Sequence, residues 1–133
     1  MRTFVLAISI FAAVTSTVVL AKDGPVKMSK KELLSFLPGK HCARITKAGS
    51  QHRWVNEPDG KFVVSTSNKK YGSPLGVRNV TGHGTWKVND EGKYCIDIDW
   101  KREPESWCSF VLKGKDGEYF LGVADKAHRI EFE

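Results

Sequence analysis

The residues that most often perform chemistry in proteins are spread along this 133-residue chain rather than grouped. No two histidines have the H-x-H or H-x-x-x-H spacing of metal ligands, and no C-x-x-C pair occurs. The G-x-S-x-G, P-loop and dinucleotide-binding motifs do not occur either. The spacing therefore predicts no metal site, no cofactor and no catalytic residues. The four histidines are His41, His52, His83 and His128.

Two carboxylates, Asp97 and Asp99, stand two residues apart, and Glu103 and Glu105 follow. Paired carboxylates perform acid–base chemistry when burial separates their pKa values. Strand alternation, however, predicts that both aspartates point outward. We therefore expect a solvated acidic patch that could meet a basic partner or a divalent ion. A hydrolase assembled from His and Asp residues remains a third hypothesis for the function.

Cys95 and Cys108 flank a charged segment, residues 101–105. If this segment closes an antiparallel hairpin with its tip near Lys101 and Arg102, residues whose numbers sum to 203 face each other, as these cysteines do. Facing positions lie within reach of a disulfide. We predict a structural bridge that stabilises the fold by about 3 kcal/mol in the chain-entropy model.

Cys42 is then the odd cysteine. We expect a half-buried, unreactive free thiol in the first strand. An intermolecular disulfide or a reactive thiol are the alternatives. The adjacent His41 is a poor catalytic partner, because neighbouring side chains on a strand point to opposite faces.

Four tryptophans are many for a chain of this length. Trp86 and Trp100 share strand faces with apolar residues, which favours packing in the core. Inward aromatic side chains of a small barrel either fill its interior or line a ligand pocket, and the sequence leaves both open. The possible ligand-facing aromatics are Trp54, Trp86, Trp100 and Trp107.

A single short helix is expected at residues 28–36. Ser29 and Glu32 have the spacing of a capping box, Leu33 and Leu34 offer an apolar face, and a Pro-Gly pair at residues 38–39 ends the helix. Two turns of helix are not stable alone in water, so we expect this helix to dock on a larger body.

The rest of the chain has the pattern of strands separated by turns. In residues 93–100 apolar and polar residues alternate with the period of a half-buried strand. Turns are predicted at residues 57–60, 89–92 and 114–117, and Gly82-His83-Gly84 is expected to be a flexible turn. We predict a mainly β fold, an antiparallel meander of about seven to eight strands that closes as a small barrel, with a sandwich as the alternative. The candidate strands cover residues 40–46, 51–56, 61–66, 75–81, 84–88, 93–100, 106–113, 118–123 and 129–132.

Residues 1–21 have the pattern of an export signal. A short basic start is followed by an uncharged, mostly apolar run at residues 4–20, and Ala21 precedes a polar segment. We expect residues 22–133 to form a single β-domain in the periplasm or outside the cell, with no stable membrane span after signal removal. An uncleaved anchor is the alternative reading of the apolar run.

The composition, with 41% hydrophobic and 27% charged residues, excludes a disordered chain and a membrane bundle. The net charge is +6, but the basic residues are dispersed. Nucleic-acid binding needs a clustered basic stripe with interleaved aromatic residues, so we expect no nucleic-acid partner.

Several short motifs occur in the order found in one family of small exported proteobacterial proteins. By these motifs the chain resembles the family named domain of unknown function 995 from Ser29 to about Phe120. The resemblance implies a bacterial periplasmic or secreted protein, and it supplies no activity and no functional residues. The motifs are ELLSFLPGK at 32–40, PDG at 58–60, GTWKV at 84–88, GKYC at 92–95 and WC at 107–108.

These observations favour recognition over reaction. We expect an exported, non-enzymatic binding module of the bacterial envelope that presents a barrel mouth or a sheet face to a small molecule or an envelope protein. The alternative is a secreted inhibitor or immunity-like protein that acts through its charged loops. The candidate loops for that role are residues 67–74 and 101–105.

Overall fold

The computed structural model describes residues 24–67, 79–101 and 103–133. The predicted export signal lies outside the described residues, and so does the loop predicted at residues 67–74, except for Ser67. The elements in chain order are β1 (Val26–Lys27), α1 (Lys30–Phe36), β2 (His41–Ile45), β3 (Gln51–Val55), β4 (Lys61–Ser67), β5 (Asn79–Val88), β6 (Tyr94–Asp99), β7 (Pro104–Ser109), β8 (Val111–Lys113), β9 (Tyr119–Leu121), the 3-10 helix η1 (Lys126–His128) and β10 (Arg129–Phe132).

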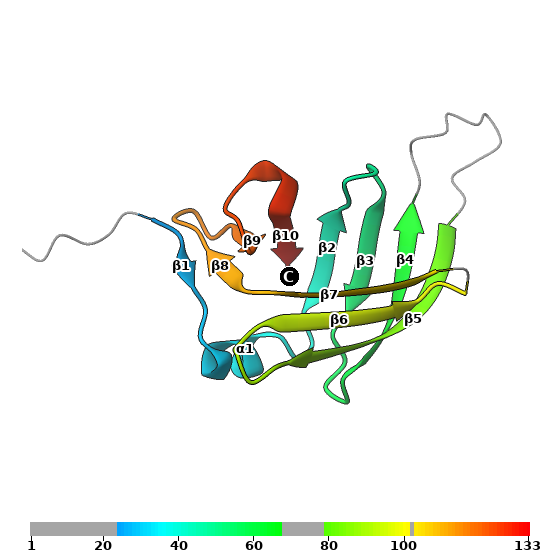
Figure 1. The fold of residues 1–133 in the computed structure, drawn as a ribbon, viewed down its shortest axis with the longest axis horizontal. Coiled ribbons are helices and arrows are strands. Elements are labelled where there is room, and N and C mark those ends of the chain that lie inside the picture. Colours follow the sequence, from blue (N-terminus) through cyan, green and yellow to red (C-terminus); the bar gives the residue numbers. More distant parts are fainter. Residues whose placement is uncertain (1–23, 68–78, 102) are drawn as a thin grey trace, which may run out of the picture.

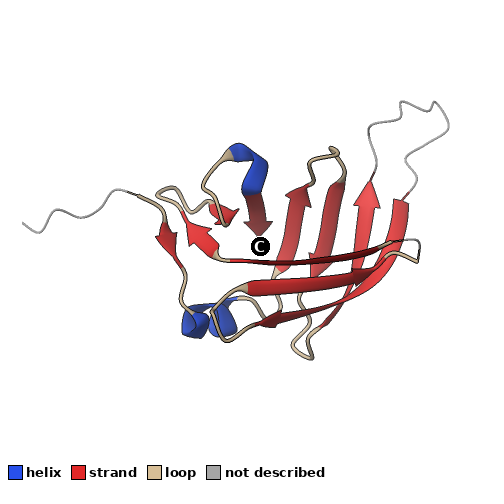
Figure 2. Ribbon diagram, in the orientation of Figure 1, coloured by secondary structure: helices blue, strands red, loops and turns tan. Residues whose placement is uncertain are grey.

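All described strands pair antiparallel in one sheet with the order β1-β8-β9-β10-β2-β3-β4-β5-β6-β7. The sheet curls into a half-barrel, in which β5, β6 and β7 cross in front of β2, β3 and β4 (Figures 1 and 2). The predicted mainly β, barrel-like fold with one short N-terminal α-helix is therefore confirmed.

The described residues form ten strands, more than the seven to eight predicted. One reason is that the strand predicted at residues 106–113 is interrupted at Phe110. The part before Phe110 is β7, which pairs with β6, and the part after it is β8, which pairs with β1 and β9. Another reason is β1, which is only two residues long. In the opposite direction, the candidates at residues 75–81 and 84–88 belong to one strand, β5, and residues 75–78 lie outside the described residues.

The helix α1 forms as its sequence predicts and covers one end of the half-barrel (Figure 1). Ser29 Oγ accepts a hydrogen bond from the Glu32 backbone N–H at 3.2 Å, and Glu32 Oε2 accepts one from the Ser29 N–H at 2.7 Å. Both sides of the capping box are thus present. Leu33 and Leu37 are fully buried, so the helix is held by its packing against the sheet.

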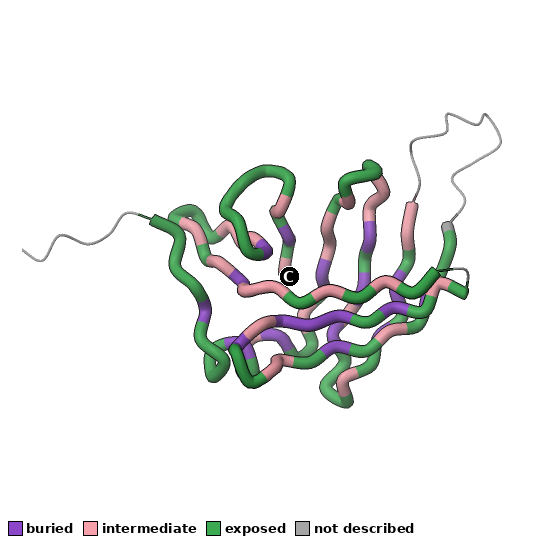
Figure 3. Tube along the Cα trace, viewed as in Figure 1, coloured by how far each residue is buried: buried purple, intermediate pink, exposed green. Residues whose placement is uncertain are grey.

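The core lies on the concave face of the sheet, where alternate residues of strands such as β3, β4 and β10 are buried (Figure 3). In β6, Tyr94, Ile96 and Ile98 are buried, whereas Asp97 and Asp99 are exposed, as the predicted alternation requires. Cys95, predicted on the same face as the two aspartates, is buried as well. One polar side chain, Asn56, is fully buried with them.

Asn56 is tolerated in the core because its polar atoms are satisfied. Its Oδ1 accepts hydrogen bonds from Tyr94 Oη at 2.6 Å and Trp54 Nε1 at 3.1 Å, and its Nδ2 donates to the Leu37 carbonyl at 3.3 Å. This network joins the helix end to the sheet.

The prediction of a turn at Gly82-His83-Gly84 is wrong, because these residues lie in the middle of β5. Their glycines leave room for core side chains rather than for a bend. A Cβ at position 82 would lie 2.8 Å from Cε3 of the Trp100 ring, and one at position 84 would lie 2.2 Å from Cζ of Phe62. Glycine inside a strand therefore marks a close approach here.

Candidate functional site

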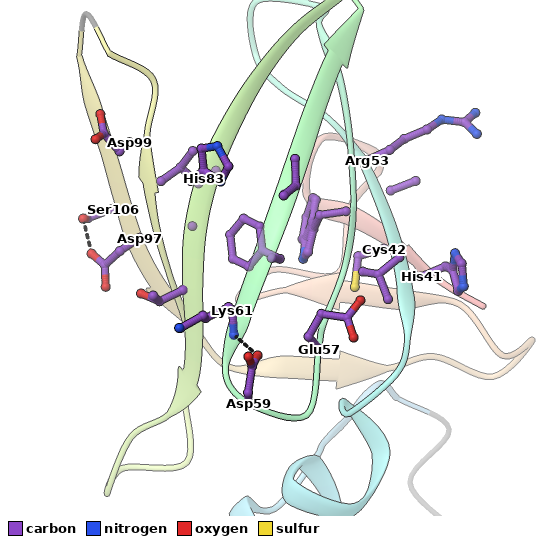
Figure 4. Close-up of a pocket in the computed structure, with 18 of the residues that line it drawn as sticks. His41, Cys42, Arg53, Glu57, Asp59, Lys61, His83, Asp97, Asp99 and Ser106 are labelled. Carbon is purple, nitrogen blue, oxygen red and sulfur yellow. Dashed lines mark hydrogen bonds between the residues drawn. The ribbon is translucent and has the colours of Figure 1, made fainter.

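A groove of about 1100 Å³ lies on the outer face of the sheet. Outward-pointing side chains from β10, β2, β3, β4, β5, β6 and β7 line it. In Figure 4, His83, Asp97 and Asp99 lie on one side of this groove, and His41 and Arg53 lie on the other. The groove exists because each of these strands exposes every second residue.

Strand register fixes a central row of side chains across the groove. His41 is opposite Val55, Val63 is opposite His83, and His83 is opposite Asp99. At the far end of the row, the Glu133 N–H donates to the His41 carbonyl at 2.8 Å. The row thus has Val55 and Val63 in its middle. Toward each end it has a histidine followed by a carboxylate, which are His41 and Glu133 at one end and His83 and Asp99 at the other.

A second row runs beside it along the ends of β4 to β7. Lys61 is opposite Thr85, Thr85 is opposite Asp97, and Asp97 is opposite Ser106, whose hydroxyl donates a hydrogen bond to the aspartate. Asp59 Oδ1 accepts from the Lys61 backbone N–H at 2.9 Å, which holds this turn carboxylate at the groove. The groove is therefore rich in hydrogen-bond acceptors.

The groove is acidic although the chain carries a net charge of +6. Six carboxylates line it against two cations, Arg53 and Lys61, which gives it a formal charge of −4 with neutral histidines. A cleft lined mainly by one sign of charge attracts ligands of the opposite sign. The carboxylates are Glu57, Asp59, Asp97, Asp99, Glu131 and Glu133.

The four tryptophans singled out in the sequence point inward. Trp54 is 4% exposed and Trp86 is 9% exposed, and the indole N–H of Trp86 donates to the Glu57 carbonyl at 2.8 Å. Trp100 and Trp107 are half-buried and pack against the core. The tryptophans therefore pack inside the half-barrel; of the four, Trp54 borders this groove and Trp107 borders a second, smaller cavity.

A second cluster of polar groups lies on the concave face. Glu105 Oε2 accepts from Trp100 Nε1 at 2.9 Å and lies 4.0 Å from Nδ1 of the buried His52. Arg44 is paired with His52 across β2 and β3, and its guanidinium carbon lies 5.1 Å from the centre of the Trp107 ring. Titratable groups are thus partly desolvated at this place.

Burial governs the protonation of this cluster. Desolvation lowers the pKa of His52, and Arg44 lowers it further, whereas the negative charge of Glu105 raises it. Desolvation also lowers the pKa of Arg44, again opposed by Glu105. One half-buried carboxylate therefore faces two basic groups.

Cys95 and Cys108 are directly opposite each other and are joined by a disulfide with an S–S distance of 2.04 Å. Cys42 is a buried free cysteine whose Sγ lies 3.5 Å from the Lys40 carbonyl. Burial raises the pKa of the Cys42 thiol to about 12, with smaller opposing effects from Tyr94 and Asn56. This environment favours the protonated, unreactive thiol.

Sequence reasoning identified the outward Asp97 and Asp99 but missed the groove to which they belong. The other groove residues, such as Lys61 and Glu131, carry the same signal, a charged residue at an outward position of an alternating strand. The sequence does not reveal which strands are neighbours. Arg44 and His52 were missed because polar residues on a concave face break the alternation.

Two features are absent from residues 24–67, 79–101 and 103–133. No group of three or more His, Cys, Asp or Glu residues there could hold a metal ion. Among the same residues, no helix has the length and apolar character needed to cross a membrane.

Comparison with known proteins gives a family and no closer relative. No curated protein and no solved structure matches the sequence. Residues 4–109 match the family described as "Protein of unknown function (DUF995)". Because this match covers well over half of the 133 residues and contains the strands from β1 to β7, the chain belongs to the DUF995 family.

Proposed function

We propose that this protein is an exported binding module whose outer groove holds a basic, extended ligand, namely a lysine- or arginine-containing peptide segment of an envelope protein. The observation that carries the proposal is the formal charge of −4 in a groove of about 1100 Å³ on a chain of charge +6. Electrostatic attraction of this kind concentrates cationic ligands and speeds their association.

The shape of the groove supports a peptide rather than a compact metabolite. Its volume is slightly above the usual range of roughly 300–1000 Å³ for small-molecule pockets. Seven neighbouring strands contribute to it, so the groove extends across the sheet. An extended segment would cross several strands and meet carboxylates near both ends.

The middle of the groove supports an apolar contact between the charged ends. Val55 and Val63 lie there, and Val63 is 55% exposed. Covering such a side chain on binding removes apolar surface from water. A ligand with basic residues on either side of an apolar residue therefore complements the groove.

An extracytoplasmic location is part of the proposal. The Cys95–Cys108 disulfide is consistent with it, because disulfides persist in oxidising compartments. The signal-like pattern of residues 1–21 supports it as well.

An inhibitor that acts through charged loops is the second candidate, and it has less support. In the loop 101–105, Glu105 turns inward to Trp100 and His52 instead of projecting from the surface. Of the other candidate loop, only Ser67 lies within the described residues.

The proposal is tested by titrating the protein with an N-acetylated, C-amidated Lys-Val-Lys-Val peptide in ¹H–¹⁵N NMR and calorimetry. We expect saturable binding that weakens with added salt, and shifts centred on β4, β5 and β6. The matching Glu-Val-Glu-Val peptide should not bind. Equal binding of the two peptides, or no binding of either, contradicts the proposal.

Variants locate the binding to the groove. Asp97→Asn combined with Asp99→Asn should weaken the lysine peptide about tenfold, and Val63→Thr should weaken it less. Asp116→Asn is the charge-matched control for the single variant Asp97→Asn, because Asp116 is exposed and does not line the groove. An effect of Asp116→Asn as large as that of Asp97→Asn would point to overall charge rather than to the groove.

A further inference from the structure

A second, smaller cavity of about 160 Å³ lies where β7 approaches β2, β9 and the 3-10 helix η1. Its lining consists of Arg44, Trp107, Ser109, Leu121 and His128. We propose that this cavity is a binding site for a small monocarboxylate. The site is separate from the outer groove, because the two share no lining residue.

The polar half of the cavity is suited to a carboxylate. The Arg44 guanidinium is planar and presents paired N–H donors, which match the two oxygens of a carboxylate. The Arg44 guanidinium carbon lies over the Trp107 ring, 5.1 Å from its centre, which is within the range of a cation–π contact. The Ser109 hydroxyl supplies one more donor.

His128, on η1, adds a second basic group to the lining. Its Nδ1 lies 2.5 Å from Asp125 Oδ1, and its backbone N–H donates to the same oxygen at 3.0 Å. A carboxylate on Nδ1 fixes the orientation of the ring and leaves Nε2 as the nitrogen available to a ligand. In its protonated form that nitrogen donates a hydrogen bond to an anion.

The carboxylates near Arg44 do not provide it with a negative partner of its own, so an added anion can bind there. Besides His128, the titratable groups that face it are Glu105 and His52, and Asp125 is already bonded to His128. Glu105 in turn accepts the Trp100 N–H. A single carboxylate is thus shared among Arg44, His52 and Trp100, so a bound anion would add a second negative partner for a half-buried cation.

The apolar half limits the size and type of the ligand. Leu121, which is 6% exposed, and the Trp107 ring supply the apolar part of the lining. A cavity of about 150 Å³ holds one benzene ring, which sets the scale for the ligand. A carboxylate with a ring or a short chain therefore fits, whereas a fully hydrated oxyanion would leave these apolar walls without a partner.

The probes are benzoate, its neutral isostere benzamide, and inorganic phosphate, followed by the indole N–H signal of Trp107 in NMR. We expect saturable binding of benzoate, and binding of benzamide and phosphate that is at least about tenfold weaker. Benzamide or phosphate binding as tightly as benzoate would overturn the monocarboxylate assignment. Failure of benzoate to saturate would overturn the site.

Two variants and one control place the ligand. Arg44→Gln and His128→Gln should each weaken the binding of benzoate about tenfold. His128 is half-exposed on η1, so its substitution leaves the core untouched. Arg53→Gln removes the same charge from the outer groove and should leave benzoate binding unchanged. Wild-type benzoate affinity in both His128→Gln and a folded Arg44→Gln would refute the proposal, whatever the outcome for the lysine peptide.

Discussion

Phe62 on β4 and Gly84 on β5 are directly opposite each other, and the phenyl ring occupies the space in which a side chain at position 84 would begin. A Cβ there would lie 2.2 Å from Cζ of Phe62 and 2.7 Å from the Asp97 carbonyl oxygen. Because Gly84 has no side chain, the ring of Phe62 can lie directly against the backbone of β5. The curvature that brings β6 and β7 over the core depends on such close approaches.

Replacing Gly84 should therefore destabilise the fold. We expect Gly84→Ala to lower the free energy of unfolding by about 1–3 kcal/mol, the usual cost of overpacking, as measured by urea denaturation. Gly24→Ala is the control, since a Cβ at Gly24 has no neighbour within 4 Å. In a Phe62→Leu background the added cost of Gly84→Ala should shrink, because the ring atoms of the clash are gone and only the close approach to the Asp97 carbonyl oxygen is left. Equal costs in both backgrounds would argue against the steric explanation.

The disulfide should contribute measurable stability. Cys95 and Cys108 are 13 residues apart, and closing a loop of this size is worth about 3 kcal/mol in the chain-entropy model. Reduction with dithiothreitol should lower the urea midpoint of the wild type by a corresponding amount. It should leave the midpoint of a Cys95→Ala, Cys108→Ala variant unchanged. An unchanged wild-type midpoint would show that the bridge is not needed for the register of β6 and β7.

The free thiol should be unreactive in the folded protein. With the pKa of Cys42 raised to about 12, only about one thiol in ten thousand is ionised at pH 8, and the thiolate is the reactive form. Thiol reagents should label no cysteine in the native protein, one in the denatured oxidised protein and three after reduction. Rapid labelling of the native protein would instead indicate that Cys42 is accessible, and Cys42→Ala would identify the labelled residue.

His52 should make the free energy of unfolding decrease as the pH is lowered. Burial lowers its pKa in the folded state below the ordinary value of about 6.5, so the unfolded chain binds the proton more readily. The contribution of the neutral His52 to the stability of the fold is fully present above pH 6.5. It is lost as the pH falls from there through the lowered pKa of His52 in the folded state. Urea denaturation from pH 8 to pH 5 should show this loss.

Two variants separate His52 from other acid effects. His52→Gln should flatten the dependence of stability on pH in this range. Glu105→Gln removes the negative charge that raises the pKa of His52, so its NMR titration should move to lower pH. A His52 titration that stays at the same pH in Glu105→Gln would contradict the arrangement described for these two residues.

Local signals in the sequence determined much of this protein. The capping box of Ser29 and Glu32, the alternation of β6 and the register of Cys95 with Cys108 depend on residues close together in the chain. The two-residue period of a strand and the geometry of turns and helix caps specify such features independently of the rest of the fold. The mainly β, barrel-like architecture follows from repeating these signals.

Only the tertiary structure decided which strands are neighbours. The Gly82 and Gly84 positions resemble a turn in the sequence, because the Phe62 and Trp100 rings that require them come from other strands. The acidic groove joins side chains from β10 to β7, and the small cavity joins Arg44 to His128 across 84 residues of chain. Such sites arise from long-range strand pairing and sheet curvature, which are set by the packing of the whole core and not by any single segment.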